Sequence, residues 1–447
     1  MKLRLIIPLA QQSILGGDLY FRLPSLGPLK VAAATPSGWE IRIIDEKVET
    51  IDFSEPVDLV GISVLTPVAP RAYRIADEYR RRGVTVVMGG MHPSKLPEEA
   101  LAHCDAVVIG EAEGLWQRLL EDFQQGRLQR IYRHAGYPSL DNLPLPDWDL
   151  YRDKRYLPVH FVETTRGCPY DCEFCAVTNS YGARFRNRPL DEVERELQSL
   201  KPFPGRFKIH NAVFFVDDLI NSNPRYAKEL FRRIRPYNLR WLGQATTLIA
   251  RDREMLELMA KSGCMGLLIG FETLSAESLS SVGKGFNRPQ QYQEIINRIH
   301  DAGIGIDGAF VFGFDHDDPG VFERTLEFVI KAKLDICYFS ILTPYPGTAL
   351  YRKLRAENRI IDEDWSHYNS CSVVFRPKQM SPEALLEGYH LVLKEFHSIS
   401  SIVRRLWGSR TQLSFFGPMN YGFRQTVKKT IAHGTAGMRP SIAPQTV

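Results

Sequence analysis

The stretch TTRGCPYDCEFC, residues 164–175, places Cys168, Cys172 and Cys175 in a C-x3-C-x2-C pattern in a chain with seven cysteines in total. Clustered thiolates are soft ligands that select zinc or an iron–sulfur cluster. A structural zinc site needs four protein ligands, and no nearby cysteine or histidine supplies a fourth at the usual spacing. Three cysteines on a four-iron cluster leave one iron open to a small ligand, which indicates a catalytic centre.

This stretch follows the first of six strands that alternate with helical patterns. We expect the strands near residues 159–165, 212–217, 240–246, 266–271, 305–312 and 336–342. Between the first two, PLDEVERELQSL (189–200) has apolar residues at helical spacing behind a proline that suits a first turn. Six such units in a row predict a (β/α)6 partial TIM barrel at 159–360, with its active site at the carboxyl ends of the strands.

Distinctive residues follow most of the other barrel strands as well. They are Asp217 and Asp218 after the second strand, Glu272 after the fourth, FVFGFDHDD (310–318) after the fifth and LTPYPGT (342–348) after the sixth. After the third strand, Gln244, Thr246 and Thr247 are ambiguous. Each group alone fits a helix cap, a turn or a surface charge. Together on one rim they indicate a binding site.

Residues 1–135 alternate short apolar runs with helical patterns, which predicts a separate α/β domain. The strand candidates are LRLIIPL, WEIRIID, DLVGISVL, VTVVMGG and DAVVIGE, with helical patterns such as RAYRIADEYRRRG (71–83) between them. Strands buried on both faces and joined by helices predict a doubly wound, Rossmann-like parallel sheet. Such sheets bind ligands in the crevice beyond the carboxyl ends of their strands.

The predicted strand ends of this first domain carry small, polar or glycine residues. They are Ser63, Val64, Leu65 and Thr66, then Gly89, Gly90, Met91 and His92, then Gly110 and Glu111. Glycines let a broad flat ligand approach the backbone, although a tight turn would also explain them. No G-x-G-x-x-G run follows the first strand, so a dinucleotide site has little support. His92 by itself is more typical of a loop or cap than of a metal ligand.

The remaining segments are a linker and a tail. Residues 136–158 are rich in Pro, Asp and Tyr and show neither the helical nor the strand spacing of apolar residues, so they predict an extended linker. Residues 361–447 predict a mostly helical extension with a disordered end. Its pattern at 382–408 is amphipathic. Packing onto the barrel is the favoured role for that helix, with contact to a membrane surface as the alternative.

Composition excludes several classes of protein. The chain has 56 Lys and Arg against 52 Asp and Glu, with 44% hydrophobic residues, so neither a nucleic-acid partner nor a disordered chain is indicated. The N-terminal apolar run is too short for a signal peptide, and no stretch approaches the roughly 20 apolar residues of a membrane span. An odd number of cysteines fits a reducing compartment. We therefore expect a cytoplasmic protein without a transmembrane segment.

The cysteine pattern, with Phe174 before its last cysteine and a β/α barrel around it, resembles the radical S-adenosylmethionine (SAM) superfamily. The resemblance implies a 4Fe-4S cluster on the three cysteines, SAM on the open iron and a 5'-deoxyadenosyl radical. It also implies SAM contacts: the backbone at Phe174 and the pair Phe312 and Gly313 at the adenine, Asp217 and Asp218 at the methionyl ammonium, and Glu272 at the ribose or methionine. The run VDD stands where that family often has Gly-Gly-Glu.

The first domain extends this resemblance to the radical SAM enzymes with a cobalamin-binding domain, which include methyltransferases, the anaerobic porphyrin cyclase and hopanoid-modifying proteins. The similar segments are LPSLGPLKVAAATPSGWEIRIIDE, GISVLT, GGMHPSKLPEEAL and DAVVIGEAE. The resemblance implies cobalamin at the glycine-rich strand ends. Because the chain lacks a D-x-H-x-x-G motif, we expect no histidine ligand to cobalt, with the loop 65–70 against the ring face.

The function implied by the resemblance is methylation of an unactivated carbon through a 5'-deoxyadenosyl radical and methylcobalamin. The alternative is a ring-forming or rearranging enzyme with the same cofactors, and a lipid or tetrapyrrole-like substrate fits either. A methylthiotransferase would need an N-terminal cysteine trio, and the first domain has only Cys104. A corrinoid carrier would not need the cysteine cluster. The expected partners are a small, apolar substrate and an electron donor such as flavodoxin or ferredoxin, with peripheral membrane contact left open.

Overall fold

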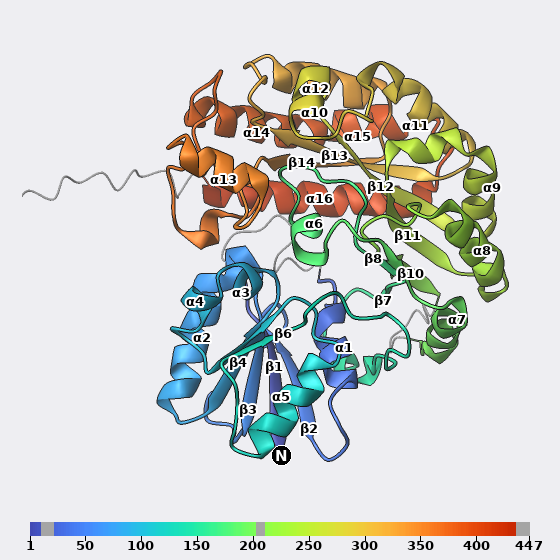
Figure 1. Cartoon of the computed structure of the whole chain (residues 1–447). Coiled ribbons are helices and arrows are strands. Elements are labelled where there is room, and N and C mark those ends of the chain that lie inside the picture. The colour runs from blue at the N-terminus through green and yellow to red at the C-terminus, as the bar shows by residue number, and fades with distance from the viewer. Residues whose placement is uncertain (10–21, 203–210, 435–447) are drawn as a thin grey trace, which may run out of the picture.

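The structure is a computed structural model that describes residues 1–9, 22–202 and 211–434. It contains two six-stranded parallel sheets, one within residues 2–133 and one within residues 160–341, and a short antiparallel pair whose two strands lie in sequence between the first two strands of the second sheet. Figure 1 shows the first sheet with its helices below the larger second unit. The predicted disordered end, beyond residue 434, lies outside the described residues.

The first sheet has the strand order β2-β1-β3-β4-β5-β6, and all of its pairs are parallel. Its strands are β1 (Lys2–Ile7), β2 (Glu40–Asp45), β3 (Leu59–Ser63), β4 (Thr85–Gly89), β5 (Ala106–Ile109) and β6 (Ile131–Arg133). Its helices are α1 (Leu26–Ala33), α2 (Ala69–Arg81), α3 (Met91–Lys95), α4 (Pro97–Ala100) and α5 (Leu115–Gln124), with the short 3-10 turn η2 (Thr66–Val68). The five predicted strands are confirmed, and β6 is an addition.

Both faces of this sheet are buried, as the predicted doubly wound fold requires. Alternate residues of β1 belong to different apolar clusters: Leu5 packs under α1 and α5, and Ile6 packs under α2. Helix α2 buries Ala72, Ala76 and Tyr79 at helical spacing. The chain leaves this helix through Gly83, whose φ of 78° suits glycine.

The second sheet has the order β14-β13-β12-β11-β10-β7, again with parallel pairs throughout. Its strands are β7 (His160–Val162), β10 (Ala212–Phe215), β11 (Arg240–Ala245), β12 (Cys264–Glu272), β13 (Gly305–Phe312) and β14 (Ile336–Ile341). The six predicted strands are confirmed, and the sheet curves into a partial barrel (Figure 1).

Helices cover the outer face of the barrel, and its inner face stays open. The helices are α7 (Leu190–Ser199), α8 (Pro224–Ile234), α9 (Arg253–Lys261), α10 (Ala276–Ser281), α11 (Tyr292–Asp301), α12 (Val321–Lys331) and α13 (Ala349–Ala356). The 3-10 turns are η3 (Trp148–Tyr151), η4 (Arg235–Tyr237), η5 (Thr247–Arg251), η6 (Pro289–Gln291) and η7 (Trp365–His367). Along β11, Trp241 is buried outside, whereas Leu242 and Gln244 are partly exposed inside. A solvent-accessible inner face is what a substrate site in a barrel requires.

The C-terminal extension contains three helices, α14 (Pro382–Phe396), α15 (Ile399–Leu406) and α16 (Leu413–Gly434). The single predicted pattern at 382–408 is two helices, because Ser398 caps α15 by accepting from the backbone N–H of Ser401. None of the described helices is long and apolar enough to cross a membrane.

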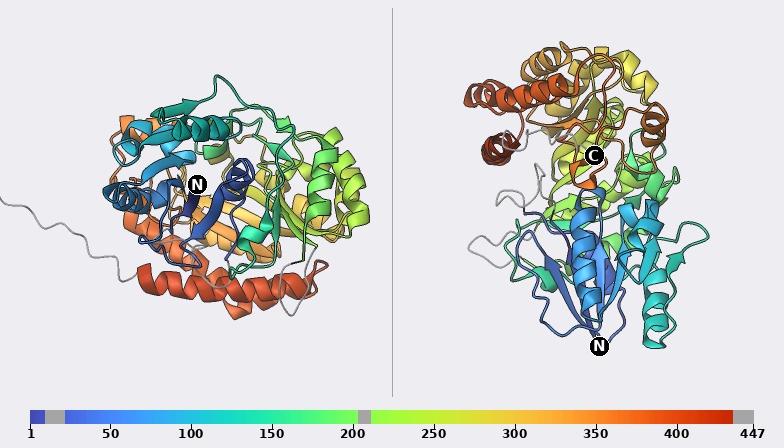
Figure 2. Two further views of the ribbon diagram at one scale, coloured as in Figure 1. Left: turned by 90° about the horizontal axis from the view of Figure 1, so that it is seen from below. Right: turned by 90° about the vertical axis from the view of Figure 1, so that its left-hand side faces the viewer.

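Helix α16 runs along one side of the barrel, as Figure 2 shows. Its Phe416 packs against Gly266 and Gly305, which are neighbours at the beginning of β12 and β13. A Cβ at Gly266 would lie 3.0 Å from the Phe416 ring, and one at Gly305 would overlap it. The two glycines therefore make room for α16 to cover this end of the strands.

Candidate active site

The three cysteines lie on a loop between the strand β8 (Thr165–Arg166) and the helix α6 (Ala176–Tyr181). Backbone contacts hold this loop to two barrel segments. The N–H of Glu173 donates to the carbonyl of Val282 at 3.1 Å, and its carbonyl accepts from Leu350 at 3.0 Å. Gly283 has a φ of 73° and allows close packing, because a Cβ there would lie 3.0 Å from the Asp171 carbonyl.

Burial raises the pKa of all three thiols, that of Cys172 to about 12. Neighbouring thiolates add to the effect, and the ammonium of Lys284 opposes it. A metal cluster would supply the positive charge that these thiolates lack. Among the described residues, no three His, Cys, Asp or Glu are close enough to share one metal ion. Three thiols on one loop can each bind a separate iron of an iron–sulfur cluster.

Asp217 and Asp218 follow β10 but differ in surroundings. Asp217 is fully buried, and its carboxylate accepts from the backbone N–H groups of Thr164 at 2.6 Å and Thr165 at 3.0 Å and from the Thr164 hydroxyl. Asp218 is partly exposed and accepts from the N–H of Gly167 at 2.9 Å. Burial raises the pKa of both carboxyls to about 6. The expected contact with a methionyl ammonium thus suits Asp218, whereas Asp217 holds the end of β7 in place.

Glu272 ends β12 with a φ of 68°, a left-handed conformation that is strained for a residue with a side chain. Its carboxylate pairs with Lys284, and both groups are largely buried. The pair lies over Gly270, where a Cβ would overlap the Glu272 carboxylate and lie 2.7 Å from the Lys284 nitrogen. Strain of this kind gathers at functional sites, in agreement with the predicted place of Glu272 at the rim.

The aromatic residues expected near the adenine are arranged differently from one another. The side chain of Phe312 is buried in the core between Phe322 and Phe339, with ring centroids 5.0 and 6.0 Å away. Phe174 instead contacts Phe314, edge to face at 6.0 Å. Gly313 has a φ of 103° and donates to Asp317. Phe314, which the sequence did not single out, therefore connects the cysteine loop to the end of β13.

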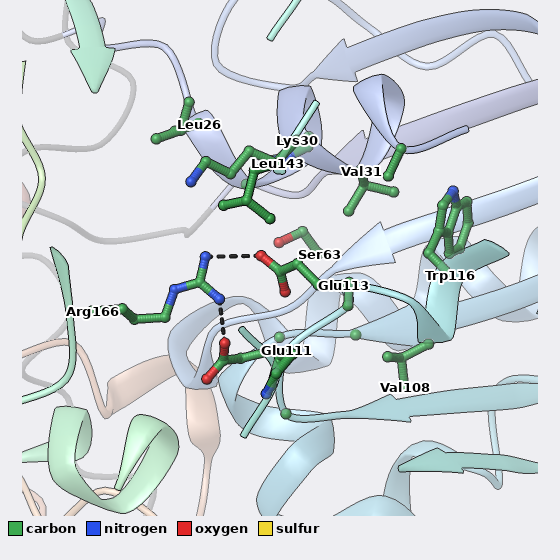
Figure 3. Close-up of a pocket in the computed structure, with 18 of the residues that line it drawn as sticks. Leu26, Lys30, Val31, Ser63, Val108, Glu111, Glu113, Trp116, Leu143 and Arg166 are labelled. Atoms are coloured by element: carbon green, nitrogen blue, oxygen red, sulfur yellow. Dashed lines mark hydrogen bonds and ion pairs between the residues drawn. The ribbon is translucent and has the colours of Figure 1, made fainter. Parts of the chain in front are cut away.

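A cavity of about 780 Å³ lies between the strand ends of the first sheet and the barrel. Seven of the ten predicted rim residues line it: Ser63, Leu65, Gly89, Gly90, Met91, Gly110 and Glu111. On the barrel side it reaches Asp218 and Tyr181. One cavity therefore joins the crevice of the first sheet to Asp218, beside the cysteine loop, and Figure 3 shows the part of it around Ser63, Glu111 and Trp116.

The side chains of Val64, Thr66 and His92 do not line this cavity. His92 is buried on the other side of the strand end, where its Nε2 lies 3.0 Å from the Tyr73 hydroxyl and its ring contacts Trp365. That no histidine binds cobalt stays a prediction.

The glycine pair at the end of β4 has two separate causes. Gly90 has a φ of 106°, and a Cβ there would lie 2.7 Å from the Val64 carbonyl, so the backbone itself requires glycine. At Gly89 a Cβ would make only ordinary contacts of 3.8 Å with Val108. Of these two glycines, Gly90 is required by the turn, whereas the missing side chain of Gly89 leaves space for the cavity.

The cavity has an apolar arm that the sequence did not reveal. The arm runs down the face of the sheet toward α1 and α5, and it is lined by Leu5, Ile62, Val87, Val31 and Trp116, together with Gly61. A Cβ at Gly61 would lie 2.9 Å from the Leu5 side chain. These residues look like ordinary core in a sequence, because nothing in a strand pattern marks which core position borders a void.

Charged side chains from both sides of the cavity form one ion-paired cluster, and all of them except Arg186 line the cavity. We call these six residues the interdomain ion cluster: Lys30, Glu111, Glu113, Glu163, Arg166 and Arg186. Figure 3 shows Arg166 reaching Glu111 and Glu113 from the opposite side of the cavity. We expected Glu111 to contact cobalamin. In the structure its carboxylate instead accepts hydrogen bonds from Arg166 and Arg186.

Family models match most of the chain. The radical SAM superfamily matches residues 162–329, the B12 binding domain matches residues 12–120, and a domain of unknown function, DUF4070, matches residues 348–420.

Two similar curated proteins come from Chlorobaculum tepidum. The bacteriochlorophyllide d C-12(1)-methyltransferase is 32% identical, with 90% of this chain and 89% of that protein aligned. The bacteriochlorophyllide d C-8(2)-methyltransferase is 30% identical, with 85% and 87% aligned.

A similar solved structure is that of the radical SAM methyltransferase TsrM from Kitasatospora setae, with cobalamin and a 4Fe-4S cluster bound. Its TM-score is 0.68 at 16% identity, and 97% of this chain and 99% of that chain are covered. This likeness shows that the two proteins share a fold over nearly their whole length.

Proposed function

The chain belongs to the radical SAM enzymes that carry a B12 binding domain, and we propose that it is a methyltransferase acting on an unactivated carbon, with a 4Fe-4S cluster, SAM and cobalamin as cofactors. Methyl transfer is favoured over ring formation because the two relatives described above are methyltransferases, and this chain aligns with nearly the whole length of each.

The cysteine loop fits a cluster on Cys168, Cys172 and Cys175. The three thiols are partly exposed, lie near the ammonium of Lys284, and are on a loop that backbone hydrogen bonds hold to the barrel. We propose that Asp218 and Glu272 bind SAM, and the position of both carboxylates at strand ends around this loop supports that role. A carboxylate facing the methionyl ammonium would make a charge-assisted hydrogen bond.

The cavity fits a large flat cofactor with an apolar appendage. At the strand ends of the first sheet, the cavity is bordered by Gly89 and Gly110, where an added Cβ would make only ordinary contacts or meet open space. Its apolar arm fits an aromatic base such as the one at the end of the cobalamin nucleotide. Leu65, which is 54% exposed, lies at the end of β3 and presents an apolar side chain rather than a metal ligand.

When bound, the cluster with SAM supplies a 5'-deoxyadenosyl radical and the corrinoid supplies the methyl group. The contribution of this chain is to bind these groups around one space and to exclude water from it. The observation that carries the proposal is the single cavity that borders both the first-sheet crevice and Asp218. Groups that must exchange a methyl have to come within contact distance, which one shared cavity allows.

The substrate we propose is a small, largely apolar molecule bound on the inner face of the barrel. The inner face offers Phe161 and Phe214, whose rings lie 5.6 Å apart, and the partly exposed Leu268. A one-electron donor such as flavodoxin or ferredoxin would reduce the cluster. We place the protein in the cytoplasm, where such donors and reduced thiols occur.

The test is anaerobic reconstitution with iron, sulfide and hydroxocobalamin, followed by incubation with SAM and a reductant. We expect 5'-deoxyadenosine, S-adenosylhomocysteine and, with a bacteriochlorophyllide as trial substrate, a methylated product. Ala at Cys168, Cys172 or Cys175 should abolish SAM cleavage, and Cys264→Ala should not. Cleavage of SAM without any S-adenosylhomocysteine in corrinoid-loaded protein would reject the methyltransferase and leave the non-methylating alternative.

A further inference from the structure

The carboxylate of Glu111 is buried between two arginines of the other sheet unit. Arg186 donates to it twice, from Nη2 to Oε1 at 2.5 Å and from Nη1 to Oε2 at 3.0 Å, and Arg166 donates from Nη1 to Oε2. The side chain of Glu111 is 2% exposed, and those of Arg166 and Arg186 are 7% and 13% exposed. Two-point arginine contacts of this kind fix geometry as well as charge.

The two arginines are direct partners in the antiparallel pair of β8 with β9 (Arg186–Asn187). Arg166 is separated from Cys168 by one residue, Gly167, whose N–H donates to Asp218 at 2.9 Å. The arginines that bind Glu111 therefore belong to the backbone segment that leads into the cysteine loop.

The other end of this connection is equally fixed. Glu111 follows β5 after Gly110, whose φ is 82° and whose N–H donates to the Ser94 hydroxyl at 2.9 Å. Ser94 in turn donates to the carbonyl of Gly90 at 2.7 Å. Glu111 therefore moves with the glycine-rich strand ends that border the cavity.

The rest of the interdomain ion cluster balances these charges. Arg166 also donates to Glu113 at 2.8 Å and to Glu163 at 2.8 and 2.9 Å, and Lys30 pairs with Glu163. Its three cations and three carboxylates leave no net charge. In a buried balanced cluster, loss of one partner leaves an uncompensated charge, so each contact constrains the others.

We propose that Glu111 is a positioning residue that, through Arg166 and Arg186, sets the distance between the crevice of the first sheet and the cysteine loop. The inference rests on the proposed function, because that distance matters only if both ends hold reacting groups. A misplacement of about 1 Å between such groups can reduce a rate about 100-fold.

The test uses Arg186→Gln as its main variant, because Arg186 does not line the cavity and acts on it only through its neighbours. Lys201→Met is the matched control, since it removes an exposed ion pair with Asp149 of the linker, 2.8 Å long. Iron and corrinoid contents, 5'-deoxyadenosine and S-adenosylhomocysteine are measured in reconstituted protein with SAM and reductant.

We expect Arg186→Gln to keep its iron and corrinoid and to lower the ratio of S-adenosylhomocysteine to 5'-deoxyadenosine at least about tenfold. Lys201→Met should leave this ratio unchanged. Glu111→Gln should lower it as well, and the double variant should lose no more than the worse single one, because the two residues share one contact. An unchanged ratio, or loss of both products together with iron, overturns the proposal.

A second measurement needs no cofactor. Hydrogen exchange of the metal-free protein should be faster in Arg186→Gln at β8, β9 and the linker 136–158, and normal in Lys201→Met. Arg186→Lys keeps the charge but only one contact point, so it should give an intermediate effect if Arg186→Gln does not fold. If the wild type forms no S-adenosylhomocysteine, the proposed function fails. The hydrogen-exchange data then test by themselves whether Glu111 and Arg186 connect the first sheet to the cysteine loop. Unchanged exchange in Arg186→Gln would refute that connection.

Discussion

The ammonium of Lys284 pairs with the carboxylate of Glu272 directly above Gly270, beside the cysteine loop. Glu272 adopts a left-handed backbone to make this pair, and Lys284 lies near enough to the thiols to favour their charged forms. The pair therefore connects the end of β12 to the electrostatics of the cluster loop.

Gly270→Ala tests this relationship, because its Cβ would overlap the Glu272 carboxylate and displace the pair. We expect SAM cleavage to fall at least about tenfold with most of the iron retained. Gly285→Ala is the control, since a Cβ there would find its nearest atom at 4.0 Å. Equal activity of the two variants would remove the Glu272–Lys284 pair from the site.

The two aspartates after β10 should respond differently to the same substitution. Asp217→Asn keeps an oxygen for the N–H groups of Thr164 and Thr165 but replaces the buried oxygen that accepts from the Thr164 hydroxyl by an NH2 donor, so we expect about 1 kcal/mol of lost stability and a less well formed cluster. Asp218→Asn should keep the fold and iron but require a higher SAM concentration for cleavage. Isothermal titration with SAM and thermal unfolding separate the two effects. Equal SAM affinity in Asp218→Asn and the wild type would contradict the assignment.

The strands and their order along the chain could be predicted because apolar runs bounded by Gly, Pro and polar residues mark buried parallel strands directly. The three-residue β6 was missed, since so short a run gives no pattern. The helical character of the C-terminal extension is confirmed, although no separate prediction was made for helix α16. It is stabilised by tertiary contacts such as Phe416 on Gly305, which no local pattern contains.

The site was predictable where one residue type has one use. The spacing of the three cysteines predicts that they bind a cluster, which stays a prediction, and the cavity does reach the predicted strand ends of the first sheet. Which member of Asp217 and Asp218 faces the cavity, and that Glu111 serves two arginines, depends on side-chain directions at strand ends. Those directions follow from packing between segments more than 50 residues apart, as in the 55-residue separation of Glu111 and Arg166.

The expectation that no histidine of this chain binds cobalt gives a spectroscopic prediction. Leu65 presents an apolar side chain to the cavity, and the imidazole of His92 is turned away toward Tyr73. Reduced cobalamin on the wild type should show no nitrogen splitting in its electron paramagnetic resonance spectrum, and His92→Ala should not alter it. Leu65→His should introduce a nitrogen ligand and its splitting. Nitrogen splitting in the wild type that is lost in His92→Ala would overturn the expectation.

Asp307 predicts a pH dependence of stability. It lies on the partly exposed inner face of β13, and its Oδ1 has no hydrogen-bond partner among the described residues. Burial, with a contribution from Asp335, raises the pKa of Asp307 to about 7. Asp335 itself is occupied by His300 at 2.9 Å and by the backbone of Ile306.

The sign follows from the two states of Asp307. In the unfolded chain its carboxyl ionises near pH 4, whereas in the folded protein it keeps its proton to about pH 7. The unfolded state binds fewer protons between these values, so stability falls as the pH rises from 4 to 7. Asp307→Asn removes this penalty and should raise the melting temperature at pH 8, with little change at pH 4.5. The corresponding gain in the free energy of unfolding at pH 8 is at most about 4 kcal/mol.

Asp317 is the matched control for Asp307, because burial raises its pKa to about 6 but its carboxylate accepts from Gly313 and Phe314 at 3.0 Å each. Asp317→Asn should therefore raise the melting temperature at pH 8 less than Asp307→Asn does, because the pKa of Asp317 is raised less and the Asn oxygen can still accept from the same two N–H groups. A lower melting temperature of Asp307→Asn at pH 8 would contradict the unpaired state of the Asp307 carboxylate. A larger rise in Asp307→Asn would show that an unpaired carboxylate lowers the stability of the fold on the face where we propose the substrate, as expected of a group that binds a ligand.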